Sequence, residues 1–489
     1  MNVLDVSIAN VSIPTIAGEL AVSPNQGTWV ITSFAVSNAV AVPISGWLAR
    51  RFGEVRLFVA CTLLFTLFSF LCGAALNFPM LLLARALQGA AAGPMIPLSQ
   101  SLMLSNYPPE RHGFANGIWG MTAVVGPVAG PVLGGWITDD YAWQWIFYIN
   151  VPIGILAAGV TWWILRQRET RILRLPVDAV GLILLIVGVF CLQVMLDKGN
   201  DLAWFGSPMI VTLGLASAFA LTLFVAWELT DKHPLVDLRL FKQRNFTVAT
   251  SAMTFGYMAY FSGVVLLPLW LQTSLNYDPT WAGITTASLG IFGVFLSPVV
   301  GRFADKVDLR VLVTFGMLLF AGLSFLMSDA DTQISFQRLF LVRLPWGIGM
   351  PFFFIPLITL SLRGLAPDTV AAASGLFNFM RLIALSIGTS LSVALWDARE
   401  AFHDQAITAQ VNAANPMAQH WLSRANELGL SPQQALGELA TQIKNQAFMQ
   451  SLNEIYWLVG WLFVGLSVLV WFSRPPRAGA PLPAAAGAH

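Results

Sequence analysis

Four charged side chains lie inside long apolar stretches of the sequence: Asp5, Arg85, Arg343 and Arg381. A charge held away from water is costly, so each of these residues is a candidate for function by default. A carboxyl group binds and releases protons, and a nearby arginine lowers its proton affinity. We therefore predict that Asp5 carries a proton and that the arginines adjust its charge state. The alternatives are that Asp5 is solvated at the start of the chain and that the arginines reach water or helix carbonyls as structural groups.

The composition of the chain shows what has to surround these charges. Of 489 residues, 56% are hydrophobic and 10% are charged, whereas a soluble domain carries about 25% charged residues. The sequence therefore predicts an all-α integral membrane protein. The net charge of +1 excludes a general basic field for nucleic acid. No Gly-Lys dipeptide forms a phosphate loop, and the histidines and cysteines have no metal-ligand spacing, so we expect no ATPase site, no metal and no cofactor.

Fourteen apolar stretches approach the length of about 20 residues that a helix needs to span the hydrocarbon core. No basic segment precedes the first stretch, so we expect no signal peptide. Most lysines and arginines of the connecting loops fall on one side, which places both chain ends in the cytoplasm. The stretches lie near residues 1–17, 28–49, 57–76, 79–104, 114–137, 142–165, 178–197, 208–229, 247–272, 282–304, 309–328, 336–362, 370–395 and 453–473.

An internal repeat divides the chain into two halves. The segment at 46–56 recurs at 301–310, and Arg85 recurs as Arg343. Repeated halves around a central site are typical of secondary transporters. We predict two six-helix bundles with two inserted helices. Their bounds are 1–165 for the first bundle, 166–245 for the inserted pair with cytoplasmic linkers, 246–473 for the second bundle and 474–489 for a disordered cytoplasmic tail.

Two further segments have a distinctive composition. Residues 396–452 are predicted to form the only long outer loop, and Ser431 followed by Pro432 predicts a helix from about 432 to 450 within it. The fifth span contains Gly126, Pro127, Gly130, Pro131, Gly134 and Gly135. Glycines four residues apart let helices approach closely, and prolines distort a helix, so we expect this span to bend during conformational switching. Tight packing alone is the alternative.

Five segments carry sequence motifs in chain order: residues 4–14, 85–89, 126–135, 143–154 and 378–381. Together they resemble the fourteen-helix drug:proton antiporters of the major facilitator superfamily, and most closely its EmrB-type multidrug exporters. The resemblance covers essentially the whole chain. Residues 4–14 resemble the first-helix motif that contains the coupling acid, and residues 85–89 resemble the fourth-helix arginine motif. The fifth-helix antiporter motif, the motif of the fourteen-helix branch and the thirteenth-helix pattern are matched at residues 126–135, 143–154 and 378–381.

Two departures from the family pattern concern helix ends. Arg50 stands where the family usually has an aspartate, whereas Asp305 keeps that acid in the second half. Family members also begin about ten residues before the position of Met1, so the first helix is expected to reach about 26 Å, short of the hydrocarbon core.

The resemblance implies proton-driven export of hydrophobic drugs and other toxic amphiphiles across the bacterial inner membrane by alternating access. It implies lipophilic, often cationic substrates, protons and the lipid bilayer as partners, with an EmrA-like periplasmic adaptor and a TolC-like outer-membrane channel.

The residues expected to line the substrate cavity are Asn10, Gln88, Trp119, Tyr257, Tyr260, Phe261, Phe353 and Asn378. Aromatic faces attract cations, although aromatic residues also fill cores. Those expected to act in conformational switching are Gly46, Arg51, Gly53, Arg56, Asp305 and Arg310, with the glycines and prolines of the fifth span.

Three other functions are open alternatives. An exporter of one metabolite, such as a siderophore, fatty acid or amino acid, differs only in the shape of its pocket. A membrane scaffold or receptor has no reason to bury Asp5, Arg85 and Arg381. An intramembrane enzyme would need a Ser/His, His/Glu or paired-aspartate constellation, which the spans lack, so we expect no enzyme activity.

Overall fold

The described part of the protein is built from helices alone. The structure is a computed structural model that describes residues 1–170, 172–173, 176–275, 277, 279–366, 369–411 and 415–474. No strand occurs in these ranges, so the all-α prediction is confirmed there. The tail predicted at 474–489 lies outside the described residues apart from Arg474.

The first half of the chain folds into helices that prolines and glycines interrupt. Two predicted spans each hold two helices: the first divides at Ser12, just before Pro14, and the fourth divides at Gly93 and Pro94. Proline lacks the N–H that a helix ladder needs, so the ladder breaks there. The helices are α1 (Asn2–Val11), α2 (Ile13–Glu19), α3 (Pro24–Gly27), α4 (Trp29–Phe52), α5 (Glu54–Gly73), α6 (Phe78–Ala92), α7 (Met95–Ser105), η1 (Pro109–Arg111), α8 (His112–Asp140), α9 (Trp145–Tyr148) and α10 (Asn150–Leu165).

The rest of the chain holds the inserted pair and the second half. The inserted pair consists of α11 (Ala179–Lys198) and α12 (Pro208–Thr230), with short turns η2 (Trp204–Gly206) and η3 (Leu238–Lys242). The second half contains α13 (Arg244–Ser274), α14 (Pro279–Ala304), α15 (Leu309–Met327), α16 (Phe336–Arg343), α17 (Trp346–Leu362), α18 (Val370–Gln410), α19 (Pro416–Glu427) and α20 (Pro432–Val470). As in the first half, a proline, Pro345, separates two helices within one predicted span.

Eleven helical stretches in the described residues are long and apolar enough to cross a membrane. The helices α8 and α14 add 29 and 26 residues, and α1 with α2 occupies the predicted first span. The total of fourteen spans stays a prediction.

Residues 396–452 were expected to form a loop that is helical only from about 432 to 450; the structure confirms that helix, but the expectation is wrong for residues 396–410 and 416–427, which are also helical. The helix α18 continues without a break to Gln410, and α20 runs as one helix of 39 residues from Pro432 into the last span. The start predicted at Ser431 is confirmed, because its side chain forms a capping box with Gln434. Hydropathy marks where an apolar run ends, but a polar segment rich in alanine, glutamine and glutamate has good helix propensity and continues the helix.

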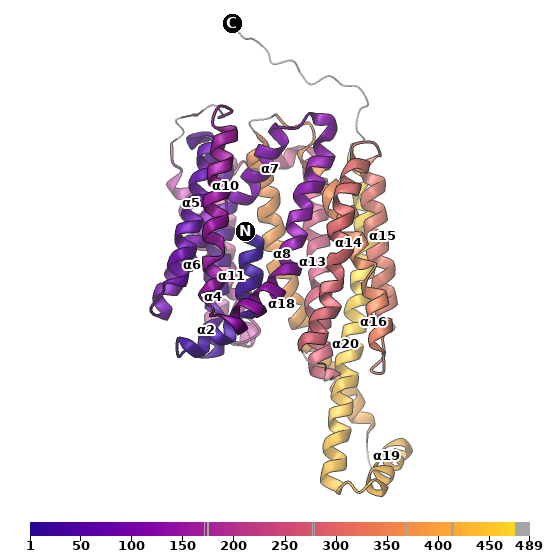
Figure 1. Ribbon diagram of the computed structural model, residues 1–489. Helices are drawn as coiled ribbons and strands as arrows, with labels where there is room; N and C mark the ends of the chain where they lie inside the picture. The colour runs from indigo at the N-terminus through magenta and orange to yellow at the C-terminus, as the bar shows by residue number, and fades with distance from the viewer. Residues whose placement is uncertain are drawn as a thin grey trace.

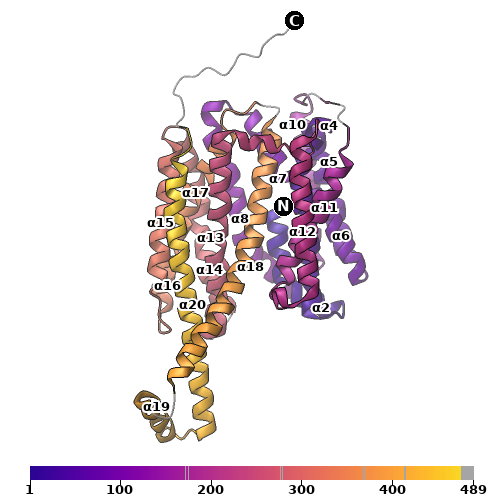
Figure 2. The same ribbon diagram turned by 180° about the vertical axis from the view of Figure 1, so that it is seen from behind.

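The two halves stand side by side, and α18 and α20 project together beyond the bundle (Figure 1). We name this projection, from about residue 397 to residue 450, the hairpin, and its side of the bundle the hairpin end. The opposite side is the basic end, where α4 ends near Arg51, α5 begins near Arg56 and α15 begins near Arg310. The inserted helix α11 contacts α4 of the first half and α18 of the second half (Figure 2). The first residue lies part-way along the bundle, so Asp5 is placed deep between the two ends.

Candidate functional site

Asp5 lies where three helices of the first half meet. It is carried by α1 and is 1% exposed. Its Oδ2 accepts a hydrogen bond from Nη1 of Arg85 on α6 at 2.6 Å. Its Oδ1 accepts from Nε2 of Gln88 at 3.2 Å and from Nδ2 of Asn150, the first residue of α10, at 2.8 Å. We name Asp5, Arg85, Gln88 and Asn150 the Asp5 cluster.

The Arg85 guanidinium is completely buried within this cluster. Its Nε donates to the carbonyl of Val30 at 3.1 Å, and its Nη1 also donates to Oε1 of Gln88 at 2.7 Å. The rings of Phe34 and Phe147 lie 4.4 and 5.4 Å from the guanidinium carbon. Aromatic faces stabilise a desolvated cation. The ion pair, the hydrogen bonds and the rings together offset the cost of burying this charge.

The Asp5 cluster can hold one proton and change its charge by one unit. With Asp5 ionised, its pair with Arg85 is neutral. When Asp5 binds a proton, Arg85 keeps its charge without a counter-charge, and removing one partner of a buried pair costs about 3–5 kcal/mol. A rearrangement that admits water or another anion to Arg85 relieves that cost. The arrangement can therefore link proton binding to a change of conformation.

The glycines of the fifth span, on α8, bring α1 into place. A Cβ at Gly126 would stand 2.8 Å from the Val3 side chain, and one at Gly134 would stand 2.9 Å from the Ile8 carbonyl. A Cβ at Gly130 would overlap Ser7. Only glycine allows this approach, and it sets the depth at which α1 presents Asp5.

The other members of this glycine–proline run do not share that contact. Gly135 faces open space, with nothing within 4 Å of a Cβ built there. The side chains of Pro127 and Pro131 lie outside the described part of the structure. The structure thus assigns a packing contact to three of the six residues that were expected to act in switching.

Arg343 in the second half is buried as completely as Arg85 but has different neighbours. Its Nη2 donates to the carbonyl of Gly263 at 2.6 Å, and the Trp346 ring lies 5.0 Å from its guanidinium carbon. Tyr456 also donates to the Gly263 carbonyl, at 3.3 Å. Among the described residues no carboxylate forms an ion pair with Arg343. In the described part of the structure, Arg343 therefore has no acid in direct contact whose proton it could control.

Arg381 joins aromatic residues from both halves. Its guanidinium carbon lies 5.7 Å from the Tyr257 ring and 5.3 Å from the Phe354 ring. Phe354 stacks on Trp119 of the first half, with ring centroids 6.0 Å apart. Tyr257 also packs against Phe261 at 4.8 Å. We name these five residues the Arg381 group; it holds three of the residues predicted to line the cavity.

The remaining cavity candidates lie elsewhere. Phe353 is 0% exposed and packs against Phe320 in the core of the second half, together with Tyr260. Its neighbour Phe354, which sequence analysis missed, is the residue that contacts Arg381. Asn378 is buried and donates to the Ser374 carbonyl at 2.8 Å. Asn10 is exposed on α1, and Gln88 belongs to the Asp5 cluster.

The two halves touch closely at two places toward the basic end, which we name the seams. Equivalent positions of the internal repeat, Gly46 and Gly301, form them. A Cβ at Gly46 on α4 would overlap the backbone of Ala372 on α18. At the equivalent position in the second half, a Cβ at Gly301 on α14 would stand 2.6 Å from the Gly113 carbonyl of α8. Asp305 strengthens the second seam, because its carboxylate accepts from the backbone N–H groups of Gly113 at 2.7 Å and Phe114 at 3.0 Å. Burial raises the pKa of Asp305, and these hydrogen bonds act against that rise.

Comparison with known proteins decides the family. The sequence profile described as Major Facilitator Superfamily matches residues 1–389. The chain belongs to the major facilitator superfamily.

Relatives within the superfamily match over nearly the whole chain. The multidrug export protein EmrB of Haemophilus influenzae is 48% identical over 97% of this chain and 94% of its own length. EmrB of Escherichia coli is also 48% identical, over 97% and 93%. The fatty acid resistance protein FarB of Neisseria gonorrhoeae is 45% identical over 97% and 94%. The resemblance to EmrB-type exporters is thereby confirmed.

Solved structures of the superfamily share the fold. The proton:xylose symporter XylE, bound to 6-bromo-6-deoxy-D-glucose, superposes with a TM-score of 0.58 over 97% of this chain and 93% of its own, at 13% identity. A human organic anion transporter gives a TM-score of 0.56 over 95% and 89%, also at 13% identity. The predicted major facilitator fold is confirmed, and the chain is a multi-pass membrane protein of a transporter family.

The other switching candidates of this superfamily member, Arg51, Gly53, Arg56 and Arg310, make local contacts at the basic end. Arg51 packs over the rings of Trp47 and Phe52, at 5.2 and 5.8 Å. Gly53 has a φ of 87°, a left-handed conformation that favours glycine. The carboxylate of Glu169 accepts from the backbone N–H of Arg56 at 2.9 Å.

In the second half, Arg310 pairs with Asp308 at 2.6 Å and lies over the Trp471 ring. The hydrogen bond from Arg310 lowers the pKa of Asp308. These contacts stabilise the basic end: Arg310 contacts residues of its own half, and Arg56 contacts Glu169 in the linker that follows the first half.

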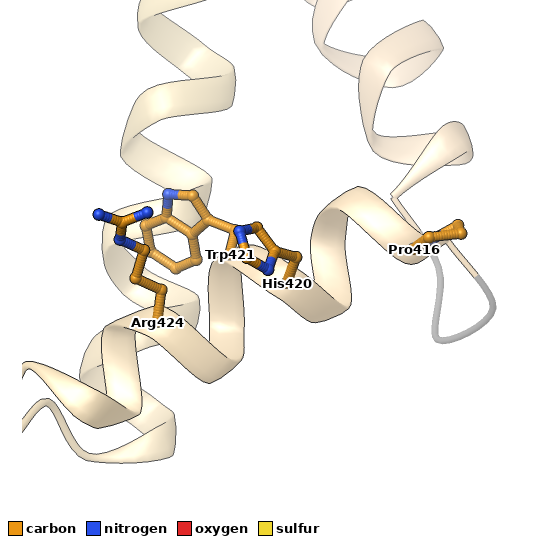
Figure 3. A pocket seen from close by; sticks show the side chains of 4 residues that line it. All are labelled: Pro416, His420, Trp421 and Arg424. Atoms are coloured by element: carbon orange, nitrogen blue, oxygen red, sulfur yellow. The ribbon is translucent and has the colours of Figure 1, made fainter.

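A hollow on the hairpin lies far from the Asp5 cluster. It has a volume of about 420 Å³ and is lined by Pro416, His420, Trp421 and Arg424. Figure 3 shows His420, Trp421 and Arg424 close together on α19, with Pro416 at the start of that helix. The hollow therefore lies outside the bundle and is not part of a path through it.

Proposed function

We propose that this chain exports hydrophobic drugs and other toxic amphiphiles across the bacterial inner membrane in exchange for protons. The observation that carries the proposal is the buried pair of Asp5 and Arg85, because a transporter that is not coupled to protons gains nothing from a titratable acid at this depth. The names of the EmrB relatives support drug export. The basic end, toward which the start of α1 and the end of α20 are directed, would face the cytoplasm, and the hairpin end would face the periplasm.

The exchange follows from the charge of the Asp5 cluster. Binding of a proton to Asp5 leaves Arg85 positive, which disfavours a lipophilic cation nearby and releases it. Loss of the proton restores the neutral pair and lets the substrate bind. The bundles at 1–165 and 246–473 would then rock against each other by opening and closing the seams at Gly46 and Gly301.

The test is drug-driven proton flux in inverted membrane vesicles. The vesicles are given an acidic interior, candidate hydrophobic drugs are added, and the pH gradient is followed. Collapse of the gradient on drug addition is the expected result. A gradient that no drug disturbs, in vesicles that contain folded protein, would argue against drug:proton exchange and for a single-metabolite exporter.

A second candidate is export of acidic amphiphiles such as fatty acids, and the Arg381 group favours it. Arg381 is 8% exposed, contacts aromatic rings and has no acidic partner among the described residues. A cation set among aromatic faces attracts a carboxylate attached to an apolar body and repels a cationic drug. The relative FarB is named for fatty acid resistance.

Replacing Arg381 by glutamine distinguishes these substrate classes. For an acidic substrate, loss of one charged contact should raise the half-saturating concentration about 10-fold or more, because hydrogen bonds to charged groups contribute about 1.5–3 kcal/mol. For a cationic drug the same variant should bind equally well or better. The measurement is the concentration dependence of substrate-driven proton flux. Equal weakening of both classes would assign Arg381 a structural role only.

We further propose that an EmrA-like adaptor docks on the hairpin, leading to a TolC-like outer-membrane channel. The hairpin offers the hollow around Trp421 and exposed apolar residues, among them Leu428 at 79% and Leu436 at 57%. Apolar side chains in a water-exposed projection are typical of an interaction surface.

Removal of residues 411–430, with a flexible glycine-serine link in their place and the cap at Ser431 kept, tests this docking. The change keeps α18 and α20 whole. Proton flux in vesicles should stay at the wild-type rate, whereas drug resistance of intact cells should be lost. The double variant Trp421→Ala/Arg424→Ala should weaken resistance in the same direction. Equal loss in vesicles and in cells would contradict a docking role.

A further inference from the structure

The two halves carry equivalent arginine sites with different surroundings. Asp5 and Arg85 are 80 residues apart in sequence, and so are Gly263 and Arg343. In both pairs the first helix of the half is bonded to the arginine, through a carboxylate in the first case and a backbone carbonyl in the second. Gly263 therefore stands at the repeat position of Asp5.

The two amides of the Asp5 cluster also have counterparts. Gln88 follows Arg85 by three residues, and Trp346 follows Arg343 by three. Asn150 belongs to the last helix of the first half, and Tyr456 belongs to the last helix of the second half. Tyr456 reaches Gly263 just as Asn150 reaches Asp5.

The comparison shows what changes when the acid is absent. A Cβ at Gly263 would stand 3.2 Å from the Tyr456 ring and 3.3 Å from the Trp346 ring, so aromatic rings pack against this glycine. The second half keeps its arginine but has neither the acid nor the amides. The amide side chains are therefore found in the half that has the acid and are missing at the equivalent positions of the half that has only the arginine.

Packing alone does not explain an amide at position 150. Most of α10 is not covered by other helices, and its buried residues are Asn150, Gly154 and Ala158. Gly154 and Ala158 are small residues that allow close approach to α5. Asn150 is 1% exposed, and its Nδ2 also donates to Oγ of Ser69 at 3.2 Å. A buried amide costs free energy unless it is hydrogen-bonded, so an apolar residue would serve packing better.

We propose that Asn150 is a positioning residue that lets Asp5 gain and lose its proton without leaving the cluster. This role rests on the proposed function, in which Asp5 is the proton carrier. An ionised carboxylate only accepts hydrogen bonds and uses the NH₂ group of the amide, as in the structure. A protonated carboxyl also donates, and the amide oxygen accepts that bond once the amide has rotated. One amide thus serves both charge states.

The charged and titratable groups that face Asp5 are few among the described residues. Arg85 faces it from α6, and the Cys72 thiol faces it from α5, with Sγ 3.5 Å from Oε1 of Gln88. The α-amino group of Met1 also interacts with it electrostatically. The helix α8 meets α1 through glycines, and α4 contributes the uncharged Asn38 and the Val30 carbonyl, so neither adds a titratable group in the described part.

The experiment is the pH profile of drug-driven proton flux for Asn150→Leu in proteoliposomes. Leucine is close in size but has no donor for the ionised carboxylate. The pH of half-maximal exchange should rise by about 1–2 units, and the maximal rate should be kept at higher pH. The reason is that a hydrogen bond to a charged group contributes about 1.5–3 kcal/mol, and about 1.4 kcal/mol corresponds to one pH unit. Asn150→Asp should raise it further, since two adjacent carboxyl groups share a proton. The matched control Asn453→Leu, which removes an amide bonded to the Ala330 carbonyl, should leave the profile unchanged.

The alternative outcomes are distinct. A rate that falls equally at every pH, with the same half-maximal pH, would assign Asn150 to packing and overturn the proposal. If Asn150→Leu does not fold, Asn150→Gln and Asn150→Asp decide, because the first should stay near the wild-type profile and the second should not. Asp5→Asn separates this role from the proposed function. Wild-type flux in Asp5→Asn defeats the proposed function, whereas lost flux together with an unshifted Asn150→Leu profile defeats only the role of Asn150.

Discussion

Replacing Asp5 by asparagine is expected to reduce drug-driven proton flux at least about 100-fold, the loss typical of removing a positioned proton carrier. Asparagine keeps the size and polarity of the side chain but cannot bind or release a proton. The Arg85 charge then has no counter-charge, so the cluster stays in one state throughout the cycle. The measurement is the rate of pH-gradient collapse in inverted vesicles on drug addition.

Two further variants make this result specific. Loss of the buried counter-charge costs about 3–5 kcal/mol, so the amount of folded protein has to be measured by thermal unfolding in detergent. Asp5→Glu keeps a titratable group and should retain part of the flux. Asp201→Asn removes an acid that is 51% exposed and should behave as the wild-type protein. Transport against a gradient by Asp5→Asn at the wild-type rate would show that the proton is carried elsewhere.

Replacing Gly46 by valine is expected to slow exchange strongly by disfavouring closure of the basic end. Its Cβ would overlap the backbone of Ala372, which cannot move without shifting α18. Overpacking of this kind costs about 1–3 kcal/mol. That cost shifts the equilibrium between the closed and the open basic end about 5–150-fold toward the open state. Drug-driven proton flux should fall accordingly. A cysteine introduced at Ser374, which is fully buried beside this seam, should react faster with a water-soluble thiol reagent.

The equivalent glycine of the second half gives a second test of the seams, and a glycine on α10 gives a control. Gly301→Val places its extra atoms against the Gly113 carbonyl and should have the same effect as Gly46→Val. Gly159→Val adds the same atoms to α10, where a Cβ meets nothing within 4 Å, and should change neither flux nor labelling. If Gly46→Val exchanges normally and Ser374→Cys stays protected, the close contact at this seam is not needed for transport.

Sequence reasoning could identify the charged residues but not all of their partners. Asp5 and Arg85 stand out because a charge is rare in an apolar run, and the structure places them 2.6 Å apart. Gln88 was expected in the substrate cavity, yet it bonds to Asp5. Asn150 lies in the quoted motif at 143–154, but no feature of the sequence marks it as a ligand of Asp5, because an amide can face lipid headgroups, another helix or a carboxylate.

Helix ends were predicted well where a local signal exists and badly where only hydropathy was available. Ser431 and Pro432 form a capping signal, and α20 begins there. No such signal marks the end of α18, which runs on to Gln410 instead of ending near residue 395. A polar segment of residues with good helix propensity continues the helix beyond the apolar run, and hydropathy does not report that propensity.

By itself, the sequence determined the membrane class, the repeated halves and the residue types that could carry a proton, because these depend on composition and on spacing along the chain. Only the tertiary structure decided which side chains meet: Asp5 with Asn150, and Phe354 instead of Phe353 with Arg381. In a bilayer the lipid-facing and the core-facing sides of a helix are both apolar, so the sequence carries no amphipathic period to tell adjacent residues apart. The rotation of each helix about its axis is set by close packing, as where the α8 glycines contact α1, and that packing exists only once the chain has folded.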